Sequence, residues 1–212
     1  MVMQQNKSSM FNLLKSNQKT VARQRRRRNE DVQFGETLAN KGIIQLWGEI
    51  TAESIYPAAS LMMEYNFMDE EEQPPQISLF IDSVGGDVFS TYHLIDLIKQ
   101  SEIPVATIGM GCIASGGVML LMSGTPGRRY ITENTYIMSH QYSTMMAGKE
   151  HELKASFYEV ELQSNKMINH YRKCTKKSEA YIRKHLLSQS DASLSPSEAI
   201  KHGLADEILK IY

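Results

Sequence analysis

Residues 104–122 read PVATIGMGCIASGGVMLLM, a run in which strand-forming residues give way to a short apolar helix pattern. Residues 104–108 are typical of a buried strand, and residues 116–122 have too little polar surface for a solvent-facing helix. Ser115 therefore stands at a helix N-terminus, where free amides and the helix dipole stabilise negative charge. Serine is also a preferred capping residue. The pattern alone predicts either a helix cap or a reactive hydroxyl.

The composition favours one main domain preceded by a tail. A chain of 212 residues with 42% hydrophobic content can bury one core. Residues 1–29 hold eight basic and no acidic residues, whereas the remainder holds 15 basic and 24 acidic residues, a net charge of −9. We predict a mobile basic tail or propeptide over residues 1–34, removed between residues 23 and 31, and one domain over residues 35–212.

Three roles are open for the basic tail, namely nucleic-acid binding, targeting and a propeptide, and a merely solvated arm is the interpretation without a role. It resembles a mitochondrial or plastid presequence, which would direct the chain to the matrix or stroma, and it also fits a propeptide or a solvated arm. Nucleic-acid binding is the weakest interpretation, because aromatic residues are almost absent from the tail. Since no apolar run approaches the ~18 residues that span a bilayer, we expect a soluble, cytoplasmic protein. The chain has only two cysteines, Cys112 and Cys174, without zinc-site spacing, so a reducing compartment and no structural metal are expected.

From residue 41 onward, strand and helix patterns alternate, which predicts an α/β domain with parallel strands. The expected strands cover residues 43–47, 77–81, 104–108, 129–131, 136–139 and 207–211. The expected helices cover residues 52–67, 87–98, 116–122, 150–175 and 178–187, with a final helix opening at residue 195. A turn is expected at residues 83–86 and a polar loop at residues 188–193.

The helix at residues 150–175 has a narrow apolar seam of heptad-like spacing. The seam consists of Leu153, Phe157, Val160, Met167 and Tyr171, with the polar Ser164 at the position between Val160 and Met167. Such a seam pairs with another helix or packs onto its own domain, and the pattern does not decide between the two.

A serine hydroxyl becomes a nucleophile when a base takes its proton and a third group orients that base. Five of the six histidines fall within helix patterns, whereas His140 alone ends a strand. Sites in α/β sheets collect at such strand ends. Asp191, in the polar loop, is the candidate orienting carboxylate, although a turn residue is the simpler interpretation of it alone.

Backbone amides complete the expected constellation. Residues 85–86 are two glycines just beyond a strand, where glycine permits the positive φ that turns an amide outward. The amides of Gly86 and Gly116 would form an oxyanion hole beside Ser115. A simple turn is the alternative interpretation of the glycine pair.

Several ordered blocks resemble the proteolytic subunit of Clp protease. They are IDSVGG at 81–86, the segment from 108 to 121 around Ser115, IMSHQ at 137–141, Asp191 to Ser195, and GLAD at 203–206. The resemblance covers residues 41–212 and implies a ClpP/crotonase-type α/β fold of repeated β-β-α units. It also implies that the helix at 150–175 is the protruding handle through which rings stack.

The resemblance further implies the activity and its partners. The implied activity is that of a Ser-His-Asp endopeptidase without cofactor or metal, which acts on unfolded polypeptides. The implied assembly is a pair of stacked heptameric rings, and the implied partner is an AAA+ unfoldase ATPase of the ClpX/ClpA type. By position, Ser115 matches the nucleophile, His140 the base and Asp191 the orienting residue. Gly86 and Gly116 match the oxyanion hole, and Phe80 an aromatic residue of the ATPase-docking pocket.

The chain departs from the family pattern at a few positions. Val84 replaces the proline of the Ser-Pro-Gly-Gly turn, Gly116 follows the serine in place of methionine, and Tyr142 replaces the proline after His-Gln. Gln100 falls where a second docking aromatic is common. The first two changes keep every backbone amide that the chemistry needs.

Other classes fit the sequence less well. Residues 109–114 match a loose dinucleotide fingerprint but lie far from the first strand-helix unit. Enoyl-CoA hydratase relatives use acidic catalysts, and Cys112 lies in an apolar stretch typical of packing. A catalytically inactive or regulatory ring subunit and a phage maturation protease remain alternatives. With no P-loop in the chain, ATP would be used by a separate partner.

Overall fold

A computed structural model describes residues 37–210 of the chain. The predicted basic tail and its predicted cleavage lie outside the described residues. Residues 37–39 are helical, and the amide of Lys41 donates to the carbonyl of Leu38 at 2.9 Å. Gly42 begins a separate compact unit, and this unit carries every candidate site residue.

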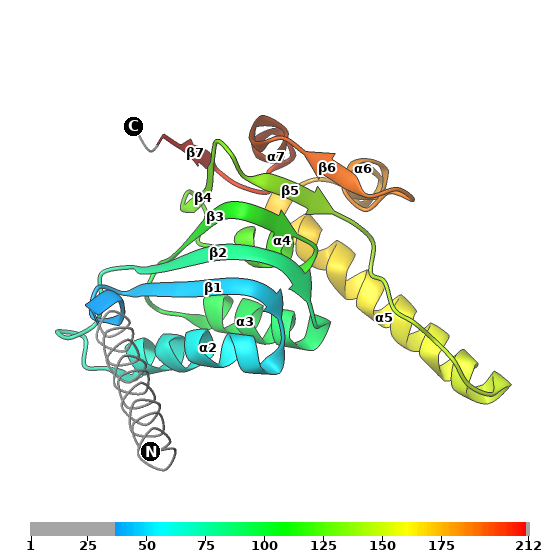
Figure 1. Cartoon of the computed structure of the whole chain (residues 1–212), viewed down its shortest axis with the longest axis horizontal. Coiled ribbons are helices and arrows are strands. Elements are labelled where there is room, and N and C mark those ends of the chain that lie inside the picture. Colours follow the sequence, from blue (N-terminus) through cyan, green and yellow to red (C-terminus); the bar gives the residue numbers. More distant parts are fainter. Residues whose placement is uncertain (1–36, 211–212) are drawn as a thin grey trace, which may run out of the picture. The chain divides into compact units, whose positions relative to one another are not determined.

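A twisted, mostly parallel sheet forms the centre of this unit (Figure 1). Its strands are β1 (Ile43–Ile50), β2 (Ile77–Gly86), β3 (Val105–Ala114), β4 (Arg129–Thr132), β5 (Tyr136–Ser139), β6 (Ala192–Leu194) and β7 (Glu207–Leu209). The order β1-β2-β3-β4-β7 is parallel throughout. β5 pairs in parallel with the end of β3, and β6 pairs antiparallel with β5. The predicted α/β class with parallel pairing is confirmed.

Six helices accompany the sheet in the described part of this unit. They are α2 (Ala52–Phe67), α3 (Val88–Gln100), α4 (Gly116–Leu121), α5 (Glu150–Thr175), α6 (Glu179–His185) and α7 (Pro196–His202). Figure 1 shows α2 and α3 together beneath β1 and β2. Alternate residues of β2, such as Ile77, Leu79 and Ile81, are fully buried on that side. Among residues 37–210, no helix combines the length and the apolar character needed to cross a membrane.

Three local predictions were wrong. The turn expected at residues 83–86 is the end of β2, because Gly85 and Gly86 continue the parallel ladder opposite Glu49 and Ile50. β3 extends to Ala114 past an irregularity, where the Asp82 carboxylate accepts the Cys112 amide at 2.9 Å. The polar loop at 188–193 contains the start of β6.

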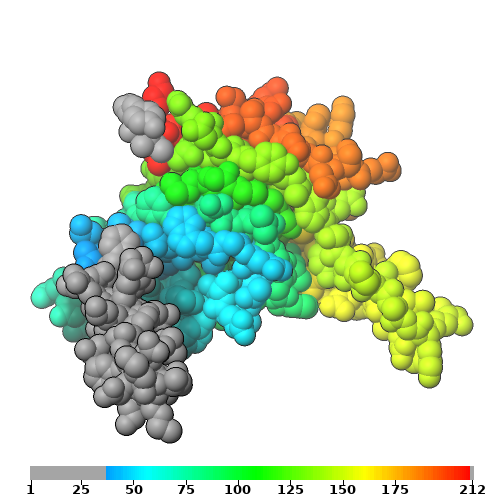
Figure 2. Space-filling model, viewed as in Figure 1, coloured from blue at the N-terminus to red at the C-terminus, as the bar shows by residue number. Residues whose placement is uncertain are grey.

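Helix α5 has the predicted bounds but two different environments. Its buried residues are Gln163, Met167, Ile168, His170, Tyr171 and Thr175, all in the C-terminal half. The N-terminal half projects from the sheet (Figures 1 and 2), with Phe157 63% exposed and Tyr158 71% exposed. Within the described chain, the seam therefore packs onto its own domain only in its second half.

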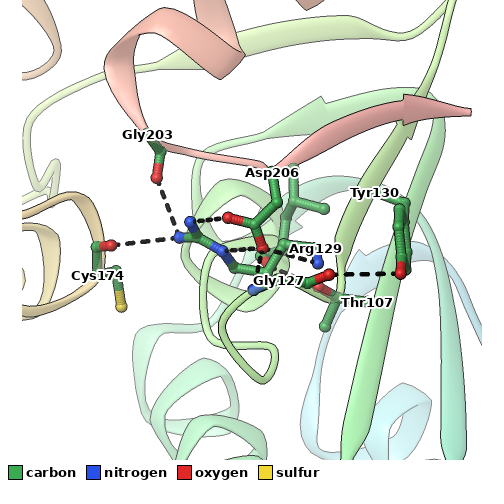
Figure 3. A network of polar contacts seen from close by, with 8 residues as sticks. Thr107, Gly127, Arg129, Tyr130, Cys174, Gly203 and Asp206 are labelled. Carbon is green, nitrogen blue, oxygen red and sulfur yellow. Dashed lines mark hydrogen bonds and ion pairs between the residues drawn. The ribbon is translucent and has the colours of Figure 1, made fainter.

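A partly buried ion pair ties the C-terminal elements together (Figure 3). Arg129 on β4 pairs with Asp206, and its Nη1 also donates to the carbonyls of Cys174 and Gly203 at 3.2 and 3.0 Å. Burial alone would raise the pKa of Asp206, but the hydrogen bonds and charge of Arg129 lower it below its usual range. The guanidinium thus joins the ends of α5 and α7 to the strand pair β4 and β7.

Candidate active site

Ser115 occupies an unusual backbone conformation between β3 and α4. Its φ of 54° and ψ of −119° are costly for a residue with a Cβ. Its amide donates to the carbonyl of Met138 on β5 at 2.9 Å. Ser115 stands at the N-cap position, yet its hydroxyl makes no capping hydrogen bond. The capping interpretation is therefore wrong, and the hydroxyl remains available for chemistry.

The end of β2 approaches Ser115 closely. A Cβ on Gly85, at φ 90°, would lie 2.6 Å from the Ser115 Cβ, so only glycine fits there. Gly86 has a φ of 149°, and a Cβ on it would lie 2.2 Å from the Ile50 carbonyl oxygen. The predicted positive φ of both glycines is confirmed. Gly116 begins α4, where backbone amides have no partner within the helix.

A small cavity of about 50 Å³ brings the candidate residues together. Ser115, His140, Gly86 and Gly116 all line it. The other lining residues come from α3, α4, α5 and the segment after β5: Val88, Thr91, Met119, Tyr142, Ser143 and Met167. Sequence reasoning did not assign these residues to the site, because an apolar helix pattern shows which face is buried but not which sheet edge it meets.

His140 lies one residue beyond β5 and is half-buried. Its Nδ1 is 2.5 Å from the carbonyl oxygen of Gln141. A carbonyl oxygen only accepts, so Nδ1 carries the proton and donates it. In the neutral ring, Nε2 then holds the free lone pair that a general base requires.

Asp191 is exposed and does not line the cavity. Within residues 37–210, its side chain makes no hydrogen bond or ion pair, so the structure does not bring it into contact with His140. Its place in the strand register is nevertheless informative, since Ser139 pairs with Ala192 in the antiparallel ladder. Extending the ladder by one pair would set Asp191 opposite His140, where Cβ atoms are about 5 Å apart.

The remaining histidines and Cys112 have other environments. His93, His151, His170, His185 and His202 all lie in helices, as expected from the sequence. Burial lowers the pKa of His170 to about 4, so this side chain is neutral at pH 7. Burial, with a contribution from the Asp82 charge, raises the pKa of Cys112. A thiol with a raised pKa is a poor nucleophile, which argues against Cys112 as the reactive group.

The sheet is mostly parallel, and a strained serine at the start of a buried helix shares one cavity with a histidine. This arrangement is typical of serine hydrolases with an α/β fold. The sequence model of the family described as Clp protease matches residues 26–211. The chain belongs to the Clp protease family.

Named relatives agree with this assignment. The chain is similar to an ATP-dependent Clp protease proteolytic subunit of Deinococcus radiodurans, with 29% identity over 72% of this chain and 74% of that protein. Subunit 2 of Frankia casuarinae is 31% identical over 72% of this chain and 70% of that protein. Chloroplastic subunit 4 of Arabidopsis thaliana is 29% identical over 73% of this chain and 52% of that protein.

Proposed function

We propose that the chain is a serine endopeptidase, the proteolytic subunit of an ATP-dependent Clp-type protease. Its membership of the family and the names of its relatives support this activity. In this mechanism Ser115 attacks the peptide carbonyl, and His140 takes the serine proton and passes it to the leaving amine. The amides of Gly86 and Gly116 hold the oxyanion, and water then releases the acyl group.

One observation carries the proposal. The Ser115 hydroxyl makes no capping bond, sits on strained backbone, and shares a cavity with a histidine whose Nδ1 proton is already held. Strained backbone persists where the surrounding structure holds it, and it is concentrated at functional sites. The bound Nδ1 proton favours the tautomer in which Nε2 accepts the serine proton.

Asp191 is the proposed orienting carboxylate in the active state. A carboxylate at Nδ1 stabilises the imidazolium that forms during catalysis, which a neutral carbonyl does less well. The β5–β6 register supports this role, because one more residue pair would join His140 and Asp191. In this proposal, Asp191 replaces the Gln141 carbonyl as the partner of Nδ1.

The proposed assembly is two stacked heptameric rings fed by an AAA+ unfoldase ATPase of the ClpX/ClpA type. The exposed apolar residues on the N-terminal half of α5 support a contact between subunits. The substrates would be unfolded polypeptides that bind in extended form. The cytoplasm is the proposed location, with a mitochondrial matrix or plastid stroma as the alternative if the basic tail is a presequence.

A fluorophosphonate probe tests the nucleophile. We expect the probe to label the wild type, and Ser115→Ala to abolish labelling and to reduce peptide cleavage by about three or more orders of magnitude. Ser143→Ala is the matched control, because it removes another hydroxyl that lines the same cavity. Near wild-type cleavage by Ser115→Ala would contradict the mechanism. An unlabelled, inactive wild type would favour the inactive ring subunit.

A second variant tests Asp191. We expect Asp191→Asn to lower kcat by about 10⁴ while KM changes little, because the amide stabilises the imidazolium poorly. Asp69→Asn, at another exposed aspartate, should leave kcat unchanged. Full activity of Asp191→Asn would assign the orienting role to the Gln141 carbonyl instead.

A further inference from the structure

A groove along the C-terminal half of α5, bordered by α3 in its first part, shares no lining residue with the Ser115 cavity. It consists of two cavities of about 610 and 510 Å³ that join at Asn169 and Lys173. We call it the basic groove after the six basic residues that line it: Lys99, Lys166, Arg172, Lys173, Lys176 and Lys177. Each of the two cavities has the volume of a small-molecule site.

The charge of the groove contrasts with that of the surrounding domain. Residues 30–212 carry a net charge of −9, yet six of their 15 basic residues line this groove beside one acidic residue, Asp96. Among residues 37–210, no carboxylate forms an ion pair with any of the six. Elsewhere on the helices, Lys154 and Arg183 do pair with glutamates. Clustered like charges repel one another, so an anion bound here would offset that repulsion.

The floor of the groove is polar but uncharged at neutral pH. His170 is neutral because burial lowers its pKa to about 4, and burial raises the pKa of Tyr92 to about 12. Burial also raises the pKa of the Cys174 thiol. Within the described chain, the buried Tyr92 hydroxyl has no hydrogen-bond partner. A ligand would therefore meet six cations and one carboxylate, Asp96, beside the neutral side chains of His170, Tyr92 and Cys174.

The shape of the groove favours a compact anion over an acidic peptide. Extended peptides bind through free strand edges or through apolar anchor pockets. The walls here are helices, which satisfy most of their own backbone groups, and Ile95 is the one aliphatic lining residue. Lysine ammonium groups, in contrast, bind phosphate as point charges.

We propose that the basic groove binds a chain of linked phosphates that spans its two cavities. Three cations line the first cavity, and four line the second, with Lys173 common to both. This arrangement matches a ligand with negative charges spaced along its length. Inorganic polyphosphate and nucleoside polyphosphates both present such a chain.

Calorimetric titration of the full chain with tripolyphosphate, at low salt and without divalent cations, tests the proposal. We expect Lys99→Gln with Lys173→Gln to weaken binding by at least about tenfold, and added salt to weaken binding to the wild type. The matched control is Lys149→Gln with Lys154→Gln, which removes the same charge from α5 and its N-cap. Because both double variants keep the basic tail, equal binding by the two would assign the phosphate to another surface and overturn the proposal.

Further titrations identify the source of the phosphate. Equal affinity for tripolyphosphate and ATP would support recognition of the phosphate chain alone, as inorganic polyphosphate would present it. Tighter binding of ATP, lost in the Lys99 and Lys173 variant, would support a nucleoside polyphosphate. No binding of either ligand, or equally tight binding of hexaglutamate to the groove, would overturn the assignment.

Discussion

The two halves of helix α5 share one heptad-like spacing of apolar residues, interrupted only by Ser164, but have opposite surroundings. Tyr171 in the C-terminal half is 1% exposed and packs in the core, whereas Phe157 in the N-terminal half is 63% exposed. The sequence left open whether the seam meets its own domain or another helix. The comparison indicates that one seam can do both, with the first half available to a second subunit.

The largest effect is expected from charges in the exposed half. Phe157→Asp with Val160→Asp should reduce the proposed assembly to single rings or smaller species and remove most peptidase activity. Burying unpaired charges in a subunit contact costs several kcal/mol per ion. Sedimentation velocity measures the size, and circular dichroism should show an intact fold.

Ala155→Asp with Asn165→Asp is the matched control, since it adds the same charge to exposed positions of α5 outside the seam. An unchanged large particle in the Phe157 and Val160 variant would refute the assembly role of this half. Sedimentation of the wild type as an active monomer would do the same.

In the buried half, Tyr171→Ala should lower the free energy of unfolding by about 3–5 kcal/mol, because it leaves a cavity in the core. Tyr158→Ala removes the same side chain from the exposed half, and we expect a change within about 0.5 kcal/mol for the isolated subunit. Urea denaturation measures both. Similar decreases in the free energy of unfolding in the two variants would contradict the difference in packing between the two halves.

His170, in the buried half of α5, makes the free energy of unfolding depend on pH. Its folded pKa of about 4 lies below the ordinary 6.5, so between these values the unfolded chain binds a proton that the folded chain does not. The free energy of unfolding should therefore fall by about 3 kcal/mol as the pH drops from 6.5 to 4. We expect this contribution to vanish in His170→Gln and to persist in His151→Gln, on the exposed half. Identical pH profiles for the two variants would contradict the assignment.

The smallest effect concerns one hydroxyl. Tyr171 and Ser139 form a buried hydrogen bond of 2.7 Å, and Ser139 immediately precedes His140. Tyr171→Phe should cost about 1 kcal/mol in the free energy of unfolding. If the bond also steadies the end of β5, kcat should fall in Tyr171→Phe and in Ser139→Ala, and it should not fall in Tyr158→Phe. Unchanged kcat in both buried variants would limit the bond to stability.

Much of the fold could be predicted because its helices have strong periodicity. The bounds of α2 and α5 agree with the predicted ranges, and the strand patterns gave the parallel class. The errors fall where backbone geometry overrides residue preference. Gly85 and Gly86 are typical of a turn, yet they extend β2 because β1 supplies a hydrogen-bonding edge beside them.

The candidate site was predictable only in part, for a physical reason. Ser115 and His140 stand at ends of neighbouring elements, so a pattern of strands and helices finds them. The lining residues Val88, Thr91 and Met167 come from helices whose position above the sheet depends on packing between distant segments. The strand β6 (Ala-Ser-Leu) is only three residues long, which is too short to give a periodic signal.

The short antiparallel pairing of β5 with β6 has a consequence for how this chain can vary in length. Ala192 pairs with Ser139, so in the proposed active state this register sets Asp191 opposite His140, whatever the number of residues between His140 and Asp191. Insertions between α6 and residue 190 would lengthen a surface loop at little cost. A single residue inserted between Asp191 and Ala192 would instead turn the carboxylate to the opposite face of the strand. The loop before residue 191 can therefore vary in length, whereas the junction between Asp191 and Ala192 cannot accept an insertion without moving the carboxylate.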